Sequence, residues 1–543
     1  MTTPDAVAAW IEADPDPRTR TELASLDPAA LGERFSDTLH FGTAGLRGPV
    51  RGGPLGMNVA VVTKATAGLA QWLIDHGHTG GTVVVGRDAR HGSEDFFAAT
   101  AEVLAAQGFD VVALPEPGPT PLVAYAVRHL HAVAGIQITA SHNPPADNGY
   151  KVYLEHGAQL VPPADAEIED LIAATGPAID IPRTPVAPDE RARNNIGHYL
   201  TRIVTRFGHR DHRSISIALT AMHGVGGDLA VQALRECGFH DVTVVGLQHA
   251  PDPDFPTAAF PNPEEPGAAD LLLALTEDID ADIAIALDPD ADRCAVGARI
   301  DGTWRMLTGD ETGALLGAQI VAAHTGEDVL VANTIVSGSL LGKIAAAAGV
   351  RYAATLTGFK WLVRAGDGLV YAYEEAIGHC VDPDGVRDKD GISAAVALCV
   401  LTQELADSDR VLADRLDEIE VEHGVHLTGQ YSVRVDDLTQ IAAIMEDLRT
   451  SPPRQLDGVE VDAEDLLERA PGASTDAVQL TGNTETGQVR VIARPSGTEP
   501  KLKFYLEVAE TPGPPPATAR TSAQARLSAI TAEIAAFCAG GRR

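Results

Sequence analysis

The sequence predicts an α/β fold of several domains, and two patterns support this prediction. Between about residues 57 and 300, short β-branched runs such as TVVVG and ADIAIAL alternate with alanine-rich helical stretches, and DVLVANTI and GSLLGKIAAAAG continue the alternation. Such alternation is typical of parallel sheets with crossover helices. After about residue 420 the pattern changes to QYSVRV, QVRVIA and KFYLEV, which indicate an antiparallel or mixed sheet. Because 543 residues exceed the size of one core, we expect three α/β domains and a different last domain.

Changes of composition along the chain indicate the domain boundaries. Residues Gly176–Glu190 are rich in proline and acidic residues and indicate an exposed connection, and a helix through His198–Phe207 would close the first domain. An alanine-rich helix over Ser522–Phe537 would end the last domain. The predicted domains are 1–207, 208–305, 306–420 and 421–543.

Composition excludes several classes of protein. A formal net charge of −35 provides no positive field for nucleic acid or an anionic membrane, so any anionic substrate must be held by local cations. The five cysteines are scattered and never form C-x-x-C, which argues against a disulfide framework or a zinc site and fits a reducing compartment. No signal peptide and no apolar run of about 18 residues is present. We expect a cytoplasmic monomer or small homo-oligomer without a membrane or nucleic-acid partner.

The first loop whose residues could take part in a reaction is ITASHNPPADNGYKVY, residues 138–153. Ser141 comes where a predicted strand ends, so its hydroxyl can be exposed beside free backbone amides that attract an anion. His142 and Lys151 add cations and possible proton carriers. Taken alone, Ser141 is better explained as an ordinary turn serine. An acyl-transfer serine is disfavoured because the surrounding sequence is not G-x-S-x-G.

The second loop is ALDPDADR, residues 286–293, directly after an apolar strand. Asp288, Asp290 and Asp292 alternate along it, so a curled loop would turn three carboxylates toward one point, which suits a hard divalent cation such as Mg²⁺. A calcium-binding EF-hand is excluded because Arg293 and Arg299 occupy the positions that need Gly and Glu. The alternative is a solvated acidic turn, which the preceding buried-type strand disfavours.

The third loop is YAYEEAIGH, residues 371–379. Glu374 and Glu375 at a strand end can accept hydrogen bonds from a polyol, and His379 could donate a proton to an oxygen that loses its phosphoryl group. The following VRDKDG adds Arg387 and Lys389 as cations for an anion. A Glu-Glu pair alone is more often a surface feature.

Two further segments combine a cation with a glycine-containing turn. In ARPSGTEPK, residues 493–501, Arg494, the hydroxyls of Ser496 and Thr498 and the turn at Gly497 would form a phosphate cradle. The alternative, a hairpin turn with incidental hydroxyls, would not need the arginine. Near the N-terminus, FGTAGLRG at residues 41–48 ends in Arg47 and indicates another anion clamp.

These five segments together resemble the α-D-phosphohexomutase superfamily of phosphoglucomutases, phosphomannomutases and related enzymes. FGTAGLRG, TASHNP, the D-x-D-x-D-R loop, the sugar loop and RPSGTEP occur in the family's order over nearly the whole chain. The sugar loop departs from the common Gly-Glu-x-Ser-Gly, with Ile377 in place of the serine. EEAIG, TGFKW and FPNPEEP resemble the branch that contains phosphoglucomutases, phosphopentomutases and glucose 1,6-bisphosphate synthases.

The resemblance implies four domains around a central cleft, three of them related α/β domains with mixed sheets and the fourth a smaller α+β domain. Ser141 would carry the phosphoryl group, and one of its oxygens would share a single Mg²⁺ with the three aspartates. Lys151 is the candidate base, and Arg47, His142 and His379 are further catalytic candidates. The residues expected to bind substrate are Arg293, Lys360, Glu375, Lys389, Arg494, Ser496, Gly497 and Thr498.

The predicted function is a phosphosugar mutase that interconverts a sugar 1-phosphate and a sugar 6-phosphate through phosphoserine and a sugar bisphosphate. A sugar 1,6-bisphosphate would be the activator and sugar phosphates the only partners. A phosphopentomutase or a glucose 1,6-bisphosphate synthase remains open. A phosphatase would not need the second phosphate cradle, and a sugar-phosphate sensor would not need the aspartate loop.

Overall fold

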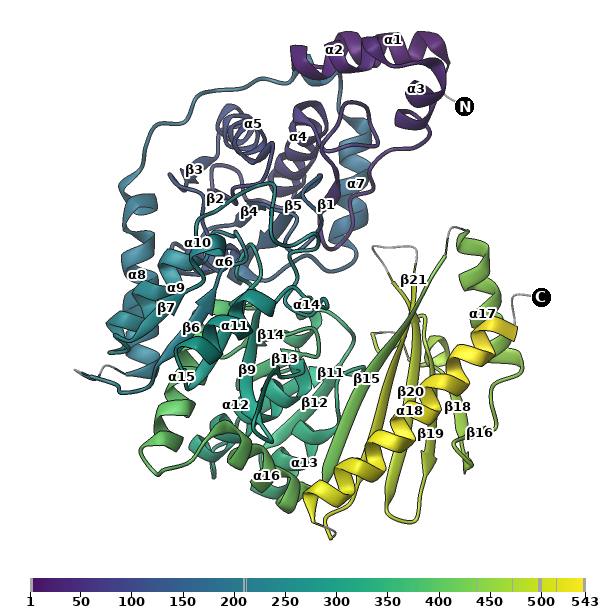
Figure 1. Ribbon diagram of the computed structural model, residues 1–543. Coiled ribbons are helices and arrows are strands. Elements are labelled where there is room, and N and C mark those ends of the chain that lie inside the picture. The colour runs from purple at the N-terminus through teal and green to yellow at the C-terminus, as the bar shows by residue number, and fades with distance from the viewer. Residues whose placement is uncertain are drawn as a thin grey trace. The chain divides into compact units, whose positions relative to one another are not determined.

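The computed structural model describes residues 3–208, 210, 212–435, 437–470, 472–496, 501–513 and 515–540. The chain folds into two compact units (Figure 1). The first contains the chain up to Leu307 together with Ile377–Ser408, and the second contains Thr308–Ala376 and the chain from Asp409 onward. Part of the third predicted domain therefore packs with the first two.

A five-stranded mixed sheet opens the first unit. Its strands in spatial order are β1 (Leu46–Pro49), β5 (Asp147–Leu154), β4 (Ala134–Ile138), β2 (Thr82–Arg87) and β3 (Asp110–Ala113). β2 pairs in parallel with β3 and β4, whereas β5 runs antiparallel to β4 and β1. Every residue of β4 is buried, as expected for a strand between helical layers. The helices around this sheet are α4 (Val59–Asp75), α5 (Ser93–Ala106), α6 (Thr120–His129) and α7 (Ala164–Ala174).

A second mixed sheet in the same unit repeats this construction. Its spatial order is β10 (Thr303–Met306), β9 (Cys294–Ile300), β8 (Ile283–Leu287), β6 (Ile217–Thr220) and β7 (Val242–Val244). β6 pairs in parallel with β7 and β8, and β9 returns antiparallel to β8. The loops that follow β4 and β8 therefore hold equivalent topological positions. In open sheets such loops at the carboxyl ends of strands bind ligands.

Helices complete the first unit. Asp189 caps α8 (Glu190–Phe207), because its carboxylate accepts a hydrogen bond from the Arg191 amide, and this cap starts the helix earlier than predicted. α15 (Gly391–Ala406) is buried along nearly its whole length and packs against α8, α9 and β8. The remaining helices are α1 (Pro4–Ala13), α2 (Pro17–Ser25), α3 (Pro28–Arg34), α9 (Gly227–Glu236), α10 (Gly246–His249) and α11 (Asp270–Asp278).

The second unit contains a parallel sheet and an antiparallel one. In the first of these, β11 (Leu330–Thr334) pairs in parallel with β12 (Arg351–Thr355) and β13 (Leu369–Glu374). Three residues separate β13 from the short β14 (Gly378–Cys380), which belongs to the first unit. The helices of this part are α12 (Gly309–Ala323), α13 (Leu340–Ala348), α14 (Phe359–Leu362) and α16 (Leu412–His423).

The antiparallel sheet has five strands. In spatial order they are β15 (Val425–Arg434), β21 (Lys501–Glu510), β20 (Gly487–Pro495), β19 (Val478–Asn483) and β18 (Asp462–Asp465). The last helix, α18 (Pro516–Gly540), crosses β15 and β21 (Figure 1) and buries Leu527, Ile530 and Ile534 in one core with these strands. α17 (Leu438–Thr450) and the short strands β16 (Gln455–Leu456) and β17 (Val459–Glu460) complete the unit.

The predicted fold class is confirmed: three α/β domains precede a C-terminal domain with an antiparallel sheet. α18 extends beyond the predicted Ser522–Phe537 at both ends, because alanine-rich sequence favours a helix even outside the packed region. Among the helices of the described residues, none is both long and apolar enough to cross a membrane.

A buried glutamate in the antiparallel sheet of the second unit pairs with an arginine of the neighbouring strand and contacts the start of α13. Glu507 on β21 accepts hydrogen bonds from the Arg490 guanidinium at 2.6 Å and from the Ser339 amide at 2.7 Å, and its Oε1 lies 3.1 Å from His426 Nδ1. Burial disfavours the charge of Glu507, but Arg490 and His426 outweigh burial and hold its pKa at about 2. The carboxylate therefore stabilises the native unit at neutral pH.

Replacing Glu507 with glutamine is expected to lower the free energy of unfolding by about 3–5 kcal/mol at neutral pH, because Glu507 is buried and the partly buried Arg490 loses its counterion. The native pKa of Glu507 lies below its ordinary value of 4.5, so its contribution is complete above that pH and is lost as the pH falls toward about 2. Melting temperatures of wild type and Glu507→Gln should therefore converge in acid. The exposed Glu485→Gln is the matched control, and a gap that widens in acid would contradict this account.

Candidate active site

Ser141 lies three residues beyond β4, in a loop whose backbone is constrained. Its φ of 51° is in the left-handed region, which is uncommon for a residue with a side chain. The Ser141 amide donates to Thr139 Oγ1 at 2.9 Å and thereby holds this conformation. Only 1% of Ser141 is exposed. A strained, nearly buried serine at a strand end is typical of a functional position.

The Ser141 hydroxyl faces three chemically different groups. It donates to Asp288 Oδ2 at 2.8 Å, and its Oγ lies 3.3 Å from His142 Nδ1 and 3.4 Å from a guanidinium nitrogen of Arg293. Arg293 also donates to His142 Nδ1 at 2.6 Å, which makes this ring nitrogen the acceptor. Burial, and then the charge of Arg293, hold the pKa of His142 well below its usual range, so the imidazole is neutral.

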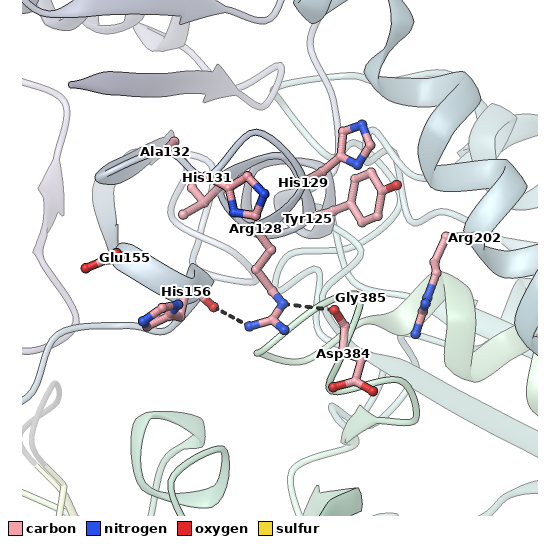
Figure 2. Close-up of a pocket in the computed structure, with 11 residues that line it drawn as sticks. Tyr125, Arg128, His129, His131, Ala132, Glu155, His156, Arg202, Asp384 and Gly385 are labelled. Atoms are coloured by element: carbon pink, nitrogen blue, oxygen red, sulfur yellow. Dashed lines mark hydrogen bonds between the residues drawn. The ribbon is translucent and has the colours of Figure 1, made fainter. Parts of the chain in front are cut away.

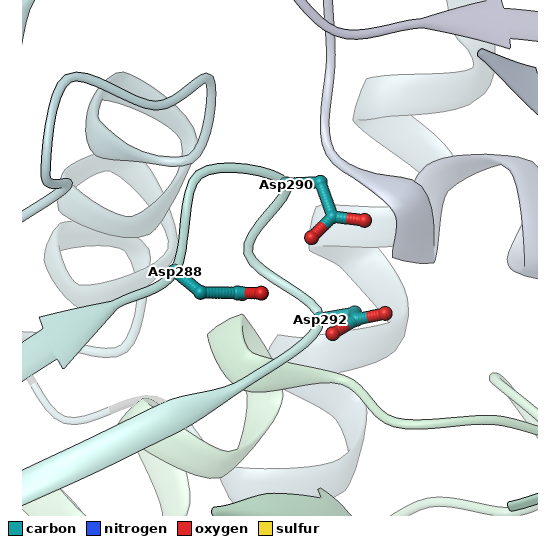
Figure 3. Close-up of side chains that lie close together, drawn as sticks. All are labelled: Asp288, Asp290 and Asp292. Atoms are coloured by element: carbon teal, nitrogen blue, oxygen red, sulfur yellow. The ribbon is translucent and has the colours of Figure 1, made fainter. Parts of the chain in front are cut away.

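The three aspartates after β8 converge as the sequence predicted (Figure 3). Asp288, Asp290 and Asp292 are all buried, and one ligand oxygen of each lies within 4.8 Å of the others. Ala291, at φ 52°, curls the loop between them. Within the described part of the chain, Oδ1 of Asp290 and Oδ1 of Asp292 are buried without a hydrogen-bond partner. Clustered carboxylates with unused oxygens fit a hard divalent cation.

Two lysines from different segments of the chain lie beside these carboxylates. Lys151 Nζ lies 2.6 Å from Asp290 and 2.7 Å from Asp292, and Lys389 Nζ lies 3.4 Å from Asp292. Burial by itself would lower the pKa of Lys151. The attraction of Asp290 and Asp292 is stronger than this effect, so the pKa of Lys151 is raised. Burial, and then repulsion from the neighbouring aspartates, raise the pKa of Asp288. The structure thus brings together the predicted residues Ser141, His142, Lys151, Asp288, Asp290, Asp292, Arg293 and Lys389.

Arg90 is a residue of this site that the sequence analysis missed. Its buried guanidinium donates to the carbonyl oxygens of Ser141 at 2.6 Å and Asn143 at 2.6 Å, and also to those of Pro144 and Asp147. One side chain therefore holds most of the serine loop. The signal in the sequence was the polar cluster GRDAR directly after the apolar strand TVVV.

Arg47 and His379 occupy different surroundings in the first unit. Arg47, on β1, donates to Asn143 Oδ1 at 2.9 Å and so contacts the serine loop. His379 lies on β14 and is fully buried. Burial lowers the pKa of His379 to about 3, so its ring is neutral at physiological pH.

Glu375 and Arg494 belong to the second unit, where both influence the pKa of the same residue, Tyr505. Glu375 Oε2 accepts hydrogen bonds from Thr334 at 3.0 Å and Ser337 at 2.9 Å, and burial raises the Glu375 pKa. Burial, and then the charge of Glu375, raise the pKa of Tyr505, whereas Arg494 opposes both. The sugar loop and the phosphate loop therefore approach each other around Tyr505, which the sequence analysis did not identify.

The other predicted substrate-binding residues of the second unit are Ser496, Gly497, Thr498 and Lys360. The Ser496 amide donates to the Lys501 carbonyl at 2.8 Å and closes the end of the β20–β21 hairpin. Gly497 and Thr498 lie outside the described residues. Lys360 belongs to α14, in the same unit.

Ile377, the departure in the sugar loop, is a core residue. Its side chain is 1% exposed and belongs to the apolar cluster of the second sheet, with Met222 and Ala295. Its carbonyl accepts a hydrogen bond from the Cys294 amide at 3.1 Å, and its φ is 55°. A branched apolar side chain at this position therefore fills the first unit's core.

Three adjoining segments of the chain match family descriptions. Residues 38–178 match phosphoglucomutase/phosphomannomutase, alpha/beta/alpha domain I. Residues 198–299 match domain II of the same family, and residues 308–420 match domain III. Together these segments cover more than half of the chain.

Curated relatives and solved structures agree with these matches. The chain is 41% identical to a protein of Haemophilus influenzae named probable phosphomannomutase, over 83% of this chain and 93% of the relative. It is 33% identical to human phosphopentomutase and 31% identical to human glucose 1,6-bisphosphate synthase, over 93% of this chain in both cases and 91% and 90% of the relatives. A phosphoglucomutase/phosphomannomutase family protein of Burkholderia thailandensis has a similar fold, with a TM-score of 0.66, 20% identity and coverage of 89% and 96%.

Proposed function

The chain belongs to the phosphoglucomutase/phosphomannomutase family and is a phosphosugar mutase, and we propose that it moves the phosphoryl group through Ser141 as a phosphoserine. The single observation that carries this proposal is the 2.8 Å hydrogen bond from Ser141 Oγ to Asp288 Oδ2. It joins the hydroxyl of Ser141, in the strained turn of the TASHNP loop, to a cluster of carboxylates suited to a metal. A nucleophile beside a metal site is what phosphoryl transfer requires.

In the proposed reaction, the Oγ–P bond of phosphorylated Ser141 breaks as a free hydroxyl of the sugar monophosphate attacks phosphorus. The hydroxyl gives its proton to a base, Ser141 Oγ leaves and takes up a proton to become a hydroxyl again, and the product is a sugar bisphosphate. The bisphosphate reorients and returns its other phosphoryl group to Ser141, which leaves the isomeric monophosphate. A sugar 1,6-bisphosphate serves as activator, because it phosphorylates Ser141 when that phosphate is lost.

We propose that Asp288, Asp290 and Asp292 hold one Mg²⁺ per chain. The buried Oδ1 atoms of Asp290 and Asp292 support this proposal, because they make no hydrogen bond among the described residues. When bound, the ion neutralises charge on the travelling phosphoryl group. The chain itself supplies Arg293, 3.4 Å from Ser141 Oγ, which can hold a phosphoryl oxygen during transfer.

Proton transfer needs a separate set of groups. Lys151 is the proposed base because of its place in the serine loop, although it is charged while it pairs with Asp290 and Asp292. We propose that His142 or His379 passes the proton on the return step. His142 lies within reach of the hydroxyl, with Nδ1 3.3 Å from Ser141 Oγ. Arg47 contacts the serine loop through its hydrogen bond to Asn143 and so helps to hold Ser141 in position.

The second unit is proposed to bind the sugar and the phosphate that does not react. Glu375 supplies a buried carboxylate for sugar hydroxyls, and Arg494 supplies a forked cation for phosphate. Ser496, Gly497 and Thr498 complete the phosphate loop, and Lys360, together with Lys389 of the first unit, adds positive charge. We also propose the four domain boundaries given above, a cytoplasmic location, and a monomer or small homo-oligomer.

We propose a hexose phosphate as the preferred substrate, supported by the relative named phosphomannomutase at 41% identity. Side-by-side kinetics with glucose 1-phosphate, mannose 1-phosphate and ribose 1-phosphate should give kcat/KM at least about tenfold higher for one of the hexose phosphates, equal to about 1.4 kcal/mol of transition-state binding. A preference for ribose 1-phosphate would contradict the hexose proposal and favour a phosphopentomutase. Net formation of bisphosphate from a phosphoryl donor would favour a bisphosphate synthase.

A further inference from the structure

A cavity with a volume of about 380 Å³ lies in the first unit at the carboxyl end of α6 (Figure 2). Its walls come from the end of α6, the loop after β5, α8 and the loop at Asp384. None of its lining residues belongs to the proposed active site. A volume of this size accommodates a small metabolite.

Basic side chains dominate this cavity in an otherwise acidic chain. Arg128, His129, His131, His156 and Arg202 all line it. The three histidines are exposed, so the cavity is open to solvent. Two acidic residues also line it, but in Figure 2 the carboxylate of Glu155 points away from Arg128.

Burial, and then nearby positive groups, disfavour positive charge on two of the residues that line the cavity. Burial, and then the charge of Arg387, lower the pKa of Arg128. Burial, and then His198 and His131, lower the pKa of His129. An anion bound beside Arg128 and His129 would favour the charged forms of both side chains.

The backbone holds the basic groups in place. His131 and His156 have φ values of 51° and 72°, both in the left-handed region. Arg128 donates to the His156 carbonyl at 3.0 Å and to the Asp384 carbonyl at 2.9 Å, so one side chain ties two walls together. Arg202 is fixed by two hydrogen bonds to Asp382, at 2.6 and 2.5 Å. Basic side chains whose positions are already fixed bind an oxyanion at a low entropic cost.

The walls of the cavity continue to the metal loop. α6 begins at Thr120, whose amide and hydroxyl donate to the Asp290 carbonyl at 3.0 Å and to Asp290 Oδ2 at 2.5 Å. The loop at Asp384 continues to Lys389, which lies 3.4 Å from Asp292. A shift of α6 or of the loop at Asp384 would therefore move a residue that contacts Asp290 or Asp292, two of the aspartates proposed to hold magnesium.

We propose that this cavity is an effector site for a small phosphate-bearing anion and that its occupancy changes the affinity of the aspartate loop for magnesium. The site lies outside the proposed reaction. By thermodynamic linkage, magnesium changes the affinity for the anion by the same factor.

The existence of the anion site is tested by isothermal titration calorimetry. Inorganic phosphate is titrated into the full chain in the absence of magnesium. The variant is His131→Asn with His156→Asn, because asparagine tolerates the left-handed backbone and carries no positive charge. The matched control is His40→Asn with His91→Asn, two exposed histidines of the same unit. We expect wild type and control to show a phosphate-binding event, in addition to any at the active site, that the variant loses or shows with at least about tenfold weaker affinity. Identical isotherms for all three proteins would overturn the proposal, because the active site is unchanged in each.

Magnesium titrations with and without phosphate test the coupling. The apparent dissociation constant for magnesium should change by about fivefold or more when phosphate is added to wild type, and by less in the variant. An equal change in both proteins would show that phosphate acts only at the active site and would overturn the coupling. If the variant melts at a lower temperature than the control, Arg202→Gln serves as a second variant with the same expected result.

Discussion

Replacing Ser141 with alanine is expected to reduce mutase turnover by at least about 10⁴-fold, because the chain then lacks the atom that carries the phosphoryl group. Thr139 cannot substitute, since its hydroxyl oxygen accepts a hydrogen bond from the Ser141 amide. Turnover should be measured with glucose 1-phosphate, Mg²⁺ and glucose 1,6-bisphosphate present. The fold should persist, because the change removes one oxygen from a loop that Arg90 holds through carbonyl groups.

The matched control for this substitution is Ser36→Ala, which removes an exposed hydroxyl in the same unit. Its turnover should equal that of wild type. A Ser141→Ala protein that retains turnover within about tenfold of wild type would exclude Ser141 as the phosphoryl carrier, since removal of a nucleophile costs far more.

Replacing Asp290 with asparagine is expected to weaken magnesium binding and to lower turnover by about 10³-fold, or about 4 kcal/mol of transition-state stabilisation. The substitution removes a negative charge from the triad and exchanges one carboxylate oxygen for a nitrogen that cannot coordinate a metal. Turnover should be measured over a range of magnesium concentrations, and magnesium affinity by calorimetry.

Asp278→Asn is the control for the Asp290 variant, because Asp278 is an exposed aspartate at the end of α11 in the same unit. Its magnesium affinity and turnover should match wild type. An Asp290→Asn protein that binds magnesium as tightly as wild type would contradict the assignment of the triad, even if its activity fell for another reason.

The sequence was sufficient to predict the aspartate cluster and the loops around it. Alternating carboxylates after an apolar strand can converge only if the loop curls, and Ala291 in the left-handed region provides that curl. The same reasoning placed Ser141 at a strand end. That the Ser141 hydroxyl meets Asp288, 147 residues later in the chain, follows from two sheets packing within one unit, which no local pattern encodes.

Other features of the site depend on tertiary packing alone. Arg90 holds the serine loop through carbonyl groups, and a sequence pattern shows a long cation but not its target. Ile377 follows a strand of the second unit, yet its side chain fills the core of the first. The burial that keeps His379 neutral likewise comes from residues distant in the sequence. These features could be found only from coordinates.

The most direct test of the central claim is to incubate the protein with glucose 1,6-bisphosphate and Mg²⁺ and to locate the transferred phosphoryl group by peptide mass spectrometry. We expect one phosphoryl group per chain, on Ser141, which added glucose 1-phosphate removes as bisphosphate forms. A protein that turns over while Ser141 stays unmodified, or that carries the label on another residue, would contradict the account.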